Sequence, residues 1–146
     1  LKAGAMAVGA RVKIQTLPGY LPMQQDRGLS NIFRTNAASQ VGDENVGTVE
    51  HRTGSTDMGD VSHLMPAIHP YVGGATGLSH GSDYVIDDYQ LSVITAAKVL
   101  ATTVVDLLAE GANQGNGVIA GHQPTMVVSE YLRFVRGLNN EEIFVP

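Results

Sequence analysis

Apolar and polar positions alternate near the start of the chain and then change to helical spacing. The alternation over 10–17 predicts a half-buried strand. The next segment, 17–28, holds two prolines and an Asp-Arg-Gly turn sequence, so it predicts an extended connection and a domain boundary. Apolar residues at helical spacing, with a serine or asparagine available as a cap, predict a short helix over 29–38.

Two more strands are predicted, over 46–52 and 67–72. A polar, glycine-broken segment, 54–66, separates them. The chain also carries 17 glycines and 6 prolines, more than a compact helical protein needs for its turns. The alternation of strands and helices with many turns predicts a mixed α/β fold.

The longest predicted element is a helix that begins at Asp87 or Asp88 and runs to about Glu110. The two carboxylates suit the positive end of a helix, where they accept hydrogen bonds from free amides. The apolar positions cover so wide a stripe that we expect the helix to be buried against a sheet. Gly111 should end it, the Gly- and Asn-rich segment 113–117 should form a flexible turn, and a second helix is predicted over 123–138.

Composition narrows the classes of function. The 146 residues are 43% hydrophobic, enough for one sizeable core. The net charge is −5 and no basic cluster is present, which argues against nucleic acid as a partner. No uninterrupted apolar run reaches the roughly 18 residues needed to span a bilayer, so we expect a soluble protein without a membrane partner.

The chain contains no cysteine. This excludes disulfides, thiolate zinc sites and a cysteine nucleophile, so any metal must bind to histidines and carboxylates. The absence of cysteine is also the one hint of a cytoplasmic location. No phosphate-binding loop and no serine nucleophile elbow is present, so phosphoryl transfer and serine hydrolysis have little support.

His80 is the first candidate for chemistry among five histidines, none of which has the HExxH spacing of a zinc motif. It follows a run of small residues and precedes the long predicted helix. In α/β sheets, loops in such positions form ligand crevices. The alternative is structural, because a single histidine is more often a satisfied structural or surface residue and the glycines here could simply turn the chain.

A second cluster contains Ser55, Thr56, Asp57 and Asp60. One helical turn would bring the two carboxylates together, where they could orient a metal-bound histidine, bind a cation or act as acid and base. The alternative is that a hydroxyl or carboxylate of the cluster caps a short helix.

Three segments in this order resemble a known family: VKIQTLPGYLPMQQD, GSTDMGDVSHLMP and SHGSDYVIDDYQL. The family is that of metal-dependent amidohydrolases and peptidases, with aminoacylases, carboxypeptidases, indole-acetyl amino acid hydrolases and aminobenzoyl-glutamate hydrolases. The resemblance covers about residues 1–110. It implies the end of an inserted lid (dimerisation) domain over 1–20 and, over 21–146, the C-terminal part of a phosphorylase/hydrolase-like α/β/α catalytic domain.

The resemblance also implies a site and a reaction. His80 would bind one of two divalent metal ions, zinc or manganese, and Ser55, Thr56, Asp57 and Gly74 would line the substrate pocket. The complete enzyme, a homodimer, would cleave the amide bond of N-acyl amino acids or dipeptide-like substrates such as aminobenzoyl-glutamate by metal-activated water.

The other metal ligands and the general-base glutamate belong to an N-terminal half of the family that this sequence does not contain. The sequence also opens at Leu1 inside an expected helix, which indicates a missing upstream portion. We therefore expect no activity from this chain alone. Two alternatives stay open: a noncatalytic oligomerisation or regulatory module, and a self-contained enzyme that pairs His63 or His80 with Asp57 or Asp60.

Overall fold

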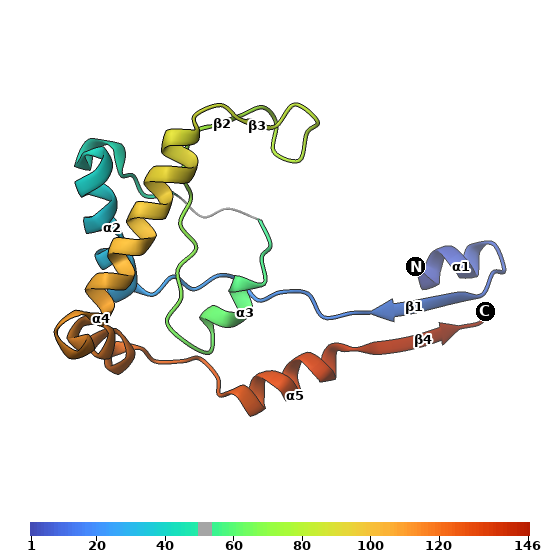
Figure 1. Ribbon diagram of the computed structural model, residues 1–146. Helices are drawn as coiled ribbons and strands as arrows, with labels where there is room; N and C mark the ends of the chain where they lie inside the picture. Colours follow the sequence, from blue (N-terminus) through green and yellow to red (C-terminus); the bar gives the residue numbers. More distant parts are fainter. Residues whose placement is uncertain (50–53) are drawn as a thin grey trace.

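The computed structural model describes residues 1–49 and 54–146 and is mainly helical (Figure 1). Two small antiparallel sheets of two strands each accompany the helices. In chain order the elements are α1 (Lys2–Ala7), β1 (Val12–Thr16), α2 (Arg27–Val41), η1 (Asp43–Asn45), α3 (Met58–Ser62), β2 (Ala75–Thr76), β3 (Val85–Ile86), η2 (Gln90–Thr95), α4 (Ala96–Gly121), α5 (Val128–Leu138) and β4 (Asn140–Phe144).

Strand β1 confirms the alternating pattern at 10–17. It pairs antiparallel with β4, with Val12 opposite Phe144 and Thr16 opposite Asn140. The exposed ion pair Lys13–Glu141, at 2.8 Å, joins the two strands, although exposed pairs of this kind contribute little to stability. Figure 1 shows this ribbon, with α1 and both termini, extending away from the other helices.

Helix α2 confirms the helix predicted over 29–38 and is longer at both ends. Its first turn is capped by Asp26, whose carboxylate accepts a hydrogen bond from the backbone N–H of Leu29 at 2.9 Å. The helix packs against α4 (Figure 1), where Val99 and Thr103 are buried. The amide of Asn36 donates to the carboxylate of Asp106 across this contact at 2.7 Å.

The long predicted helix is also present. The carboxylate of Asp88 accepts a hydrogen bond from the N–H of Leu91 at 2.9 Å, as expected of a residue at this helix start. The chain then passes through the π-helical η2 into α4. The backbone leaves helical geometry from Ala109 to Ala112, which confirms a break at the predicted end.

The flexible turn predicted after that break is wrong, because residues 113–121 continue as helix. The change of direction is completed within the four residues of the kink. A Cβ at Gly115 would lie only 2.8 Å from the carbonyl oxygen of Leu107, so glycine lets the second part of α4 return close to the first. Helix α5 confirms the last predicted helix but begins at Val128, because the backbone of Val127 is extended; before it, the N–H of Thr125 is bound to the carbonyl of His63 at 3.1 Å.

The strand predicted over 67–72 is wrong. Its backbone bonds to the connection before α2 instead of to another strand: the carbonyl of Ala67 accepts from Asp26, and the N–H of His69 donates to the side chain of Gln25. Of the strand predicted over 46–52, residues 46–49 are irregular and the rest, including His51, lies outside the described residues.

The sizeable core expected from composition is not formed by the described residues. The buried apolar residues among them are Ala5, Ala67 and Val99. The burial expected for the long helix is likewise incomplete, because only one side of α4 is covered.

By length and composition the combined helix Gln90–Gly121 could cross a membrane. It has 32 residues, and the mean hydropathy of its most apolar window is 1.8; 11% of that window is buried.

Candidate functional site

His80 lies at the exposed tip of the hairpin formed by β2 and β3. Its turn is closed by a hydrogen bond from the N–H of Gly81 to the carbonyl of Leu78 at 2.6 Å. His80 has φ of 65°, in the left-handed region, which a residue with a side chain adopts only at a cost. Backbone outliers of this kind are common at functional sites, so the conformation is consistent with a functional role for His80.

Gly74 lies at the base of the same hairpin. Its carbonyl accepts hydrogen bonds from the N–H groups of Asp87 and Asp88 at 3.0 and 3.1 Å. Its φ is 91°, and a Cβ there would lie 2.8 Å from the carbonyl oxygen of Asp88. Glycine is therefore required at this position to join the hairpin to the start of the long helix. This structural requirement is separate from the predicted role of Gly74 in a substrate pocket.

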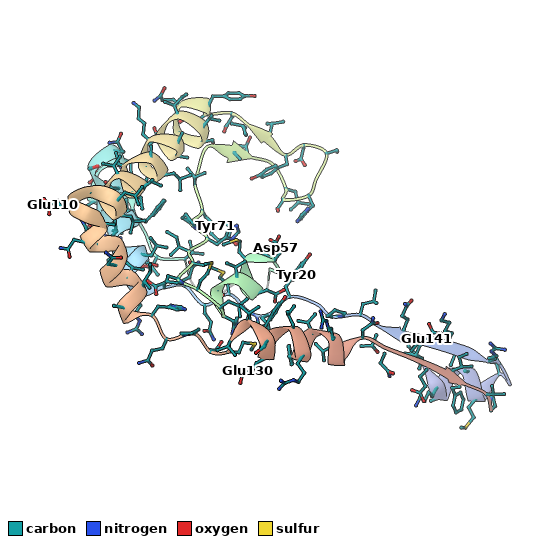
Figure 2. All side chains as sticks on the ribbon, turned by 60° about the horizontal axis from the view of Figure 1, so that its bottom comes forward. Tyr20, Asp57, Tyr71, Glu110, Glu130 and Glu141 are labelled. Atoms are coloured by element: carbon teal, nitrogen blue, oxygen red, sulfur yellow. The ribbon has the colours of Figure 1, made fainter. Side chains whose placement is uncertain are left out.

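Ser55, Thr56 and Asp57 precede α3, and Figure 2 shows Asp57 at the start of this helix. The hydroxyl of Thr56 accepts from the N–H of Met58 at 3.4 Å and donates to the carboxylate of Asp57 at 3.3 Å. These contacts are local to the turn that leads into α3, which begins at Met58 without a side-chain cap from Asp57. Among the described residues, no cluster of three metal-ligand side chains includes Asp57.

Asp60 and Ser62 attach α3 to the extended connection before α2. The carboxylate of Asp60 accepts from the N–H of Leu21 at 2.8 Å, and the hydroxyl of Ser62, 1% exposed, accepts from the N–H of Gln24 at 2.9 Å. The second oxygen of Asp60 accepts from the hydroxyl of Tyr131 at 2.9 Å. The hydrogen bond to Asp60, followed by burial and by the charge of Asp60, raises the pKa of Tyr131.

His63 is buried and uses both ring nitrogens for structure. Its Nε2 lies 2.9 Å from the carbonyl oxygen of Pro22, and its Nδ1 lies 2.7 Å from the hydroxyl of Thr125. Because a carbonyl only accepts, Nε2 donates to Pro22, while the Thr125 hydroxyl contacts Nδ1 and also donates to the His63 carbonyl at 3.4 Å. His63 is thus held between two connections, and Asp60 is engaged elsewhere, so the two do not form the catalytic pair that the self-contained enzyme would require.

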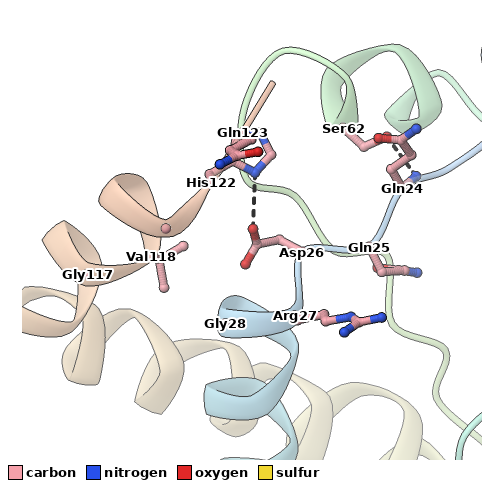
Figure 3. A pocket seen from close by; sticks show the side chains of 11 residues that line it. Gln24, Gln25, Asp26, Arg27, Gly28, Ser62, Gly117, Val118, His122 and Gln123 are labelled. Atoms are coloured by element: carbon pink, nitrogen blue, oxygen red, sulfur yellow. Dashed lines mark hydrogen bonds and ion pairs between the residues drawn. The ribbon is translucent and has the colours of Figure 1, made fainter. Parts of the chain in front are cut away.

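A pocket that the sequence did not predict lies between the start of α2 and the end of α4 (Figure 3). Its volume is about 320 Å³. In its wall, Nδ1 of His122 lies 3.1 Å from the carboxylate of Asp26, and both side chains are largely buried. Nε2 of His122 has no hydrogen-bond partner among the described residues.

The pair Asp26–His122 has the composition of a carboxylate–histidine unit, in which the acid orients the imidazole. The other oxygen of Asp26 caps α2, so the same carboxylate links two helices. The pair was not predictable from spacing because its members are separated by 96 positions. The available signal was local: Asp26 lies three residues before the helix predicted over 29–38, and His122 lies directly before the helix predicted over 123–138.

No metal site is complete in the part of the chain that the structure describes. Over residues 1–49 and 54–146, no three histidine, aspartate or glutamate side chains gather closely enough to hold an ion. His80 therefore forms no three-ligand group with Asp57 and Asp60. The described residues alone do not fit a two-metal centre, which needs several ligands and an open position for water.

Part of the chain is similar to a dipeptidase. Over 120 residues it is 30% identical to Xaa-Arg dipeptidase of Mus musculus, a match that covers 76% of this chain and 28% of the mouse protein. Over 61 residues it is 38% identical to Xaa-Arg dipeptidase of Homo sapiens, covering 38% of this chain and 14% of the human protein. No protein-family model and no solved structure matches the chain.

The two dipeptidase matches relate the chain to peptidases in part of its length. They agree with the class of enzyme that the sequence motifs indicated, a hydrolase of peptide-like bonds, and they select no branch within it. The chain spans about a quarter of the mouse relative and less of the human one.

Proposed function

We propose that this chain is part of a metal-dependent hydrolase of dipeptides or N-acyl amino acids, to which it contributes His80 as one metal ligand. The similarity to Xaa-Arg dipeptidase over 76% of the chain carries the proposal. Small amides ending in a free amino acid, including aminobenzoyl-glutamate, are the substrate class. Zinc or manganese is the proposed metal, with two ions in the complete site.

The geometry of His80 supports this role. Its side chain is exposed on a hairpin tip, and its ring makes no hydrogen bond to another described residue. It differs in this from His63, whose two ring nitrogens are both bound. An imidazole with free nitrogens on a projecting turn is available to a ligand set supplied from elsewhere.

The remaining ligands and the general base would come from residues outside this sequence. In the complete protein the metal ions would activate water and polarise the amide carbonyl. Ser55, Thr56, Asp57 and Gly74 stay proposed as lining of the substrate pocket. The chain alone should neither hold two ions nor hydrolyse amides, because one histidine does not make such a centre.

The test joins this chain to the region of the mouse dipeptidase that it does not match. Hydrolysis of arginine-terminated dipeptides, N-acyl amino acids and aminobenzoyl-glutamate would be measured with added zinc or manganese, for this protein and for the chain alone. We expect activity only in the joined protein, and its loss in His80→Ala. His69→Ala is the matched control. Equal loss in both variants, or activity of the chain alone, would contradict the proposal.

A noncatalytic oligomerisation module is the second candidate. The exposed apolar side chains of α4 favour it, since large exposed apolar patches mark interaction sites. Metal binding separates the two candidates: the hydrolase needs zinc or manganese retained through His80, and the module does not. Sedimentation of the joined protein would also test the proposed homodimer.

A further inference from the structure

One side of α4 and the turn before it is apolar and uncovered. Successive residues of an α-helix are rotated by about 100°, so residues three or four positions apart lie on the same side. Eight residues between 93 and 108 share one side in this way. All eight residues are exposed, and none is polar or charged. We call this the outer face of α4; it consists of Val93, Ile94, Ala97, Leu100, Ala101, Val104, Val105 and Leu108. Leu100, Val104 and Leu108 are 53%, 52% and 67% exposed.

The opposite side of α4 is covered by α2. Val99 and Thr103 are buried there, and Asp106 accepts the hydrogen bond from Asn36. The side that packs on α2 is thus mixed, with Thr103 and Asp106 beside Val99, whereas the outer face is apolar throughout. An apolar stripe of this kind normally faces a core or a partner surface.

A lipid bilayer is a poor occupant of the outer face. Insertion of α4 would carry the attached α2 with it, including the buried polar contact Asn36–Asp106 and the charged pair Arg34–Asp43. Charges within the hydrocarbon region are costly. Straight helix also ends near Leu108, because the backbone departs from helical geometry at Ala109. Packing of the outer face against a protein surface would leave the pair Arg34–Asp43 exposed to water.

We infer that the outer face of α4 is the surface on which the remainder of a dipeptidase-length chain packs. The mouse relative supports this occupant, because the match covers 28% of it and leaves most of the protein available as a partner surface. The surface should be apolar and uncharged to match the outer face. This inference rests on the relation to dipeptidases in the proposed function but not on metal binding by His80.

The test expresses the 146-residue chain, carrying an affinity tag, together with the unmatched region of the mouse dipeptidase as a separate polypeptide. The matched mouse segment with the same region shows that the two-piece format works. We expect the tagged chain to co-purify the mouse region in a 1:1 ratio. Val104→Glu should reduce recovery at least tenfold, and it should leave the melting temperature of the chain alone unchanged, because residue 104 is exposed there.

Val145→Glu is the matched control, since Val145 is 64% exposed but lies beyond β4. It should leave recovery unchanged. Failure of the wild-type chain to recover the mouse region, or equal recovery with Val104→Glu, would overturn the inference. So would a stable dimer of the chain alone that Val104→Glu dissociates, or flotation of the chain with phosphatidylcholine vesicles. A 1:1 complex without amide hydrolysis would keep the inference and reject the proposed function.

Discussion

The hydroxyl of Tyr131 donates a 2.9 Å hydrogen bond to the carboxylate of Asp60, and this bond ties α5 to α3. The other carboxylate oxygen of Asp60 is bound to the N–H of Leu21 at 2.8 Å. Leu21 and Tyr131 lie 39 and 71 positions from Asp60 in the sequence. One carboxylate therefore holds together three segments that are distant in the chain, a structural role for a residue that sequence reasoning considered for chemistry.

The raised pKa of Tyr131 predicts a stability that depends on alkaline pH. In the unfolded chain the phenol loses its proton near pH 10.0, while in the folded chain it keeps the proton to higher pH because it donates to Asp60. The stabilisation is therefore complete below pH 10.0 and is lost as the pH rises through the raised pKa. Tyr131→Phe should lack this dependence and cost about 1 kcal/mol at neutral pH.

Melting temperatures of the wild type and Tyr131→Phe, measured between about pH 8 and pH 11, would check this prediction. The gap between the two proteins should narrow above pH 10.0. Tyr20→Phe is the control, because Tyr20 is 58% exposed. A gap of constant size across this range would contradict a role for the Tyr131 hydroxyl.

Gly59 should tolerate no side chain. It is buried in α3, and a Cβ there would overlap the carbonyl oxygen of Leu21. Gly59→Ala must push α3 away from the extended connection, so we expect a loss of about 1–3 kcal/mol in the free energy of unfolding by urea. Gly137→Ala is the matched control: it has open space in α5, and alanine there should be neutral or stabilising by up to about 1 kcal/mol. Equal effects would show that α3 can shift freely.

Local signals made part of this fold predictable. The alternation in β1 and the apolar spacing of α2 and α4 are properties of neighbouring residues, and all three elements form. The missed features depend on distant partners. The segment before α5 is tied to His63 through the N–H of Thr125, and the segment after Ala67 bonds to the connection before α2 in place of a second strand. No pattern of spacing contains such pairings.

The candidate site shows the same division. The turn around His80 and the helix start at Asp57 were local and form as elements of structure. The pair Asp26–His122 joins residues 96 positions apart, so neither residue indicated the other. The metal role of His80 and the pocket role of Ser55, Thr56, Asp57 and Gly74 came from the family resemblance and stay predictions.

Asp26 should contribute through two separable contacts. One carboxylate oxygen caps α2 at Leu29, and the other binds His122. Asp26→Ala removes both and should cost the most, with the cap alone worth about 0.5–2 kcal/mol. Asp26→Ser keeps a capping oxygen but is too short to reach His122, so its cost should be close to that of His122→Ala. Urea unfolding of the three variants checks the order; a Ser variant as unstable as the Ala variant would contradict the separation.

The left-handed backbone of His80 allows its imidazole and its conformation to be tested separately. Glycine and asparagine adopt φ near 65° readily, whereas alanine does not. The hairpin of His80→Gly and His80→Asn should therefore be more stable than that of His80→Ala by about 1 kcal/mol. Amide hydrogen exchange of Val85 and Ile86, which pair with β2, measures this stability.

The same three variants then test the proposed metal role. If the imidazole binds metal, His80→Gly and His80→Asn should abolish hydrolysis by the joined protein although their hairpins are intact. If only the shape of the turn matters, these two should retain activity and His80→Ala alone should lose it. Retained activity in His80→Asn would therefore reject His80 as a metal ligand, and parallel losses in all three variants would assign the role to the imidazole ring.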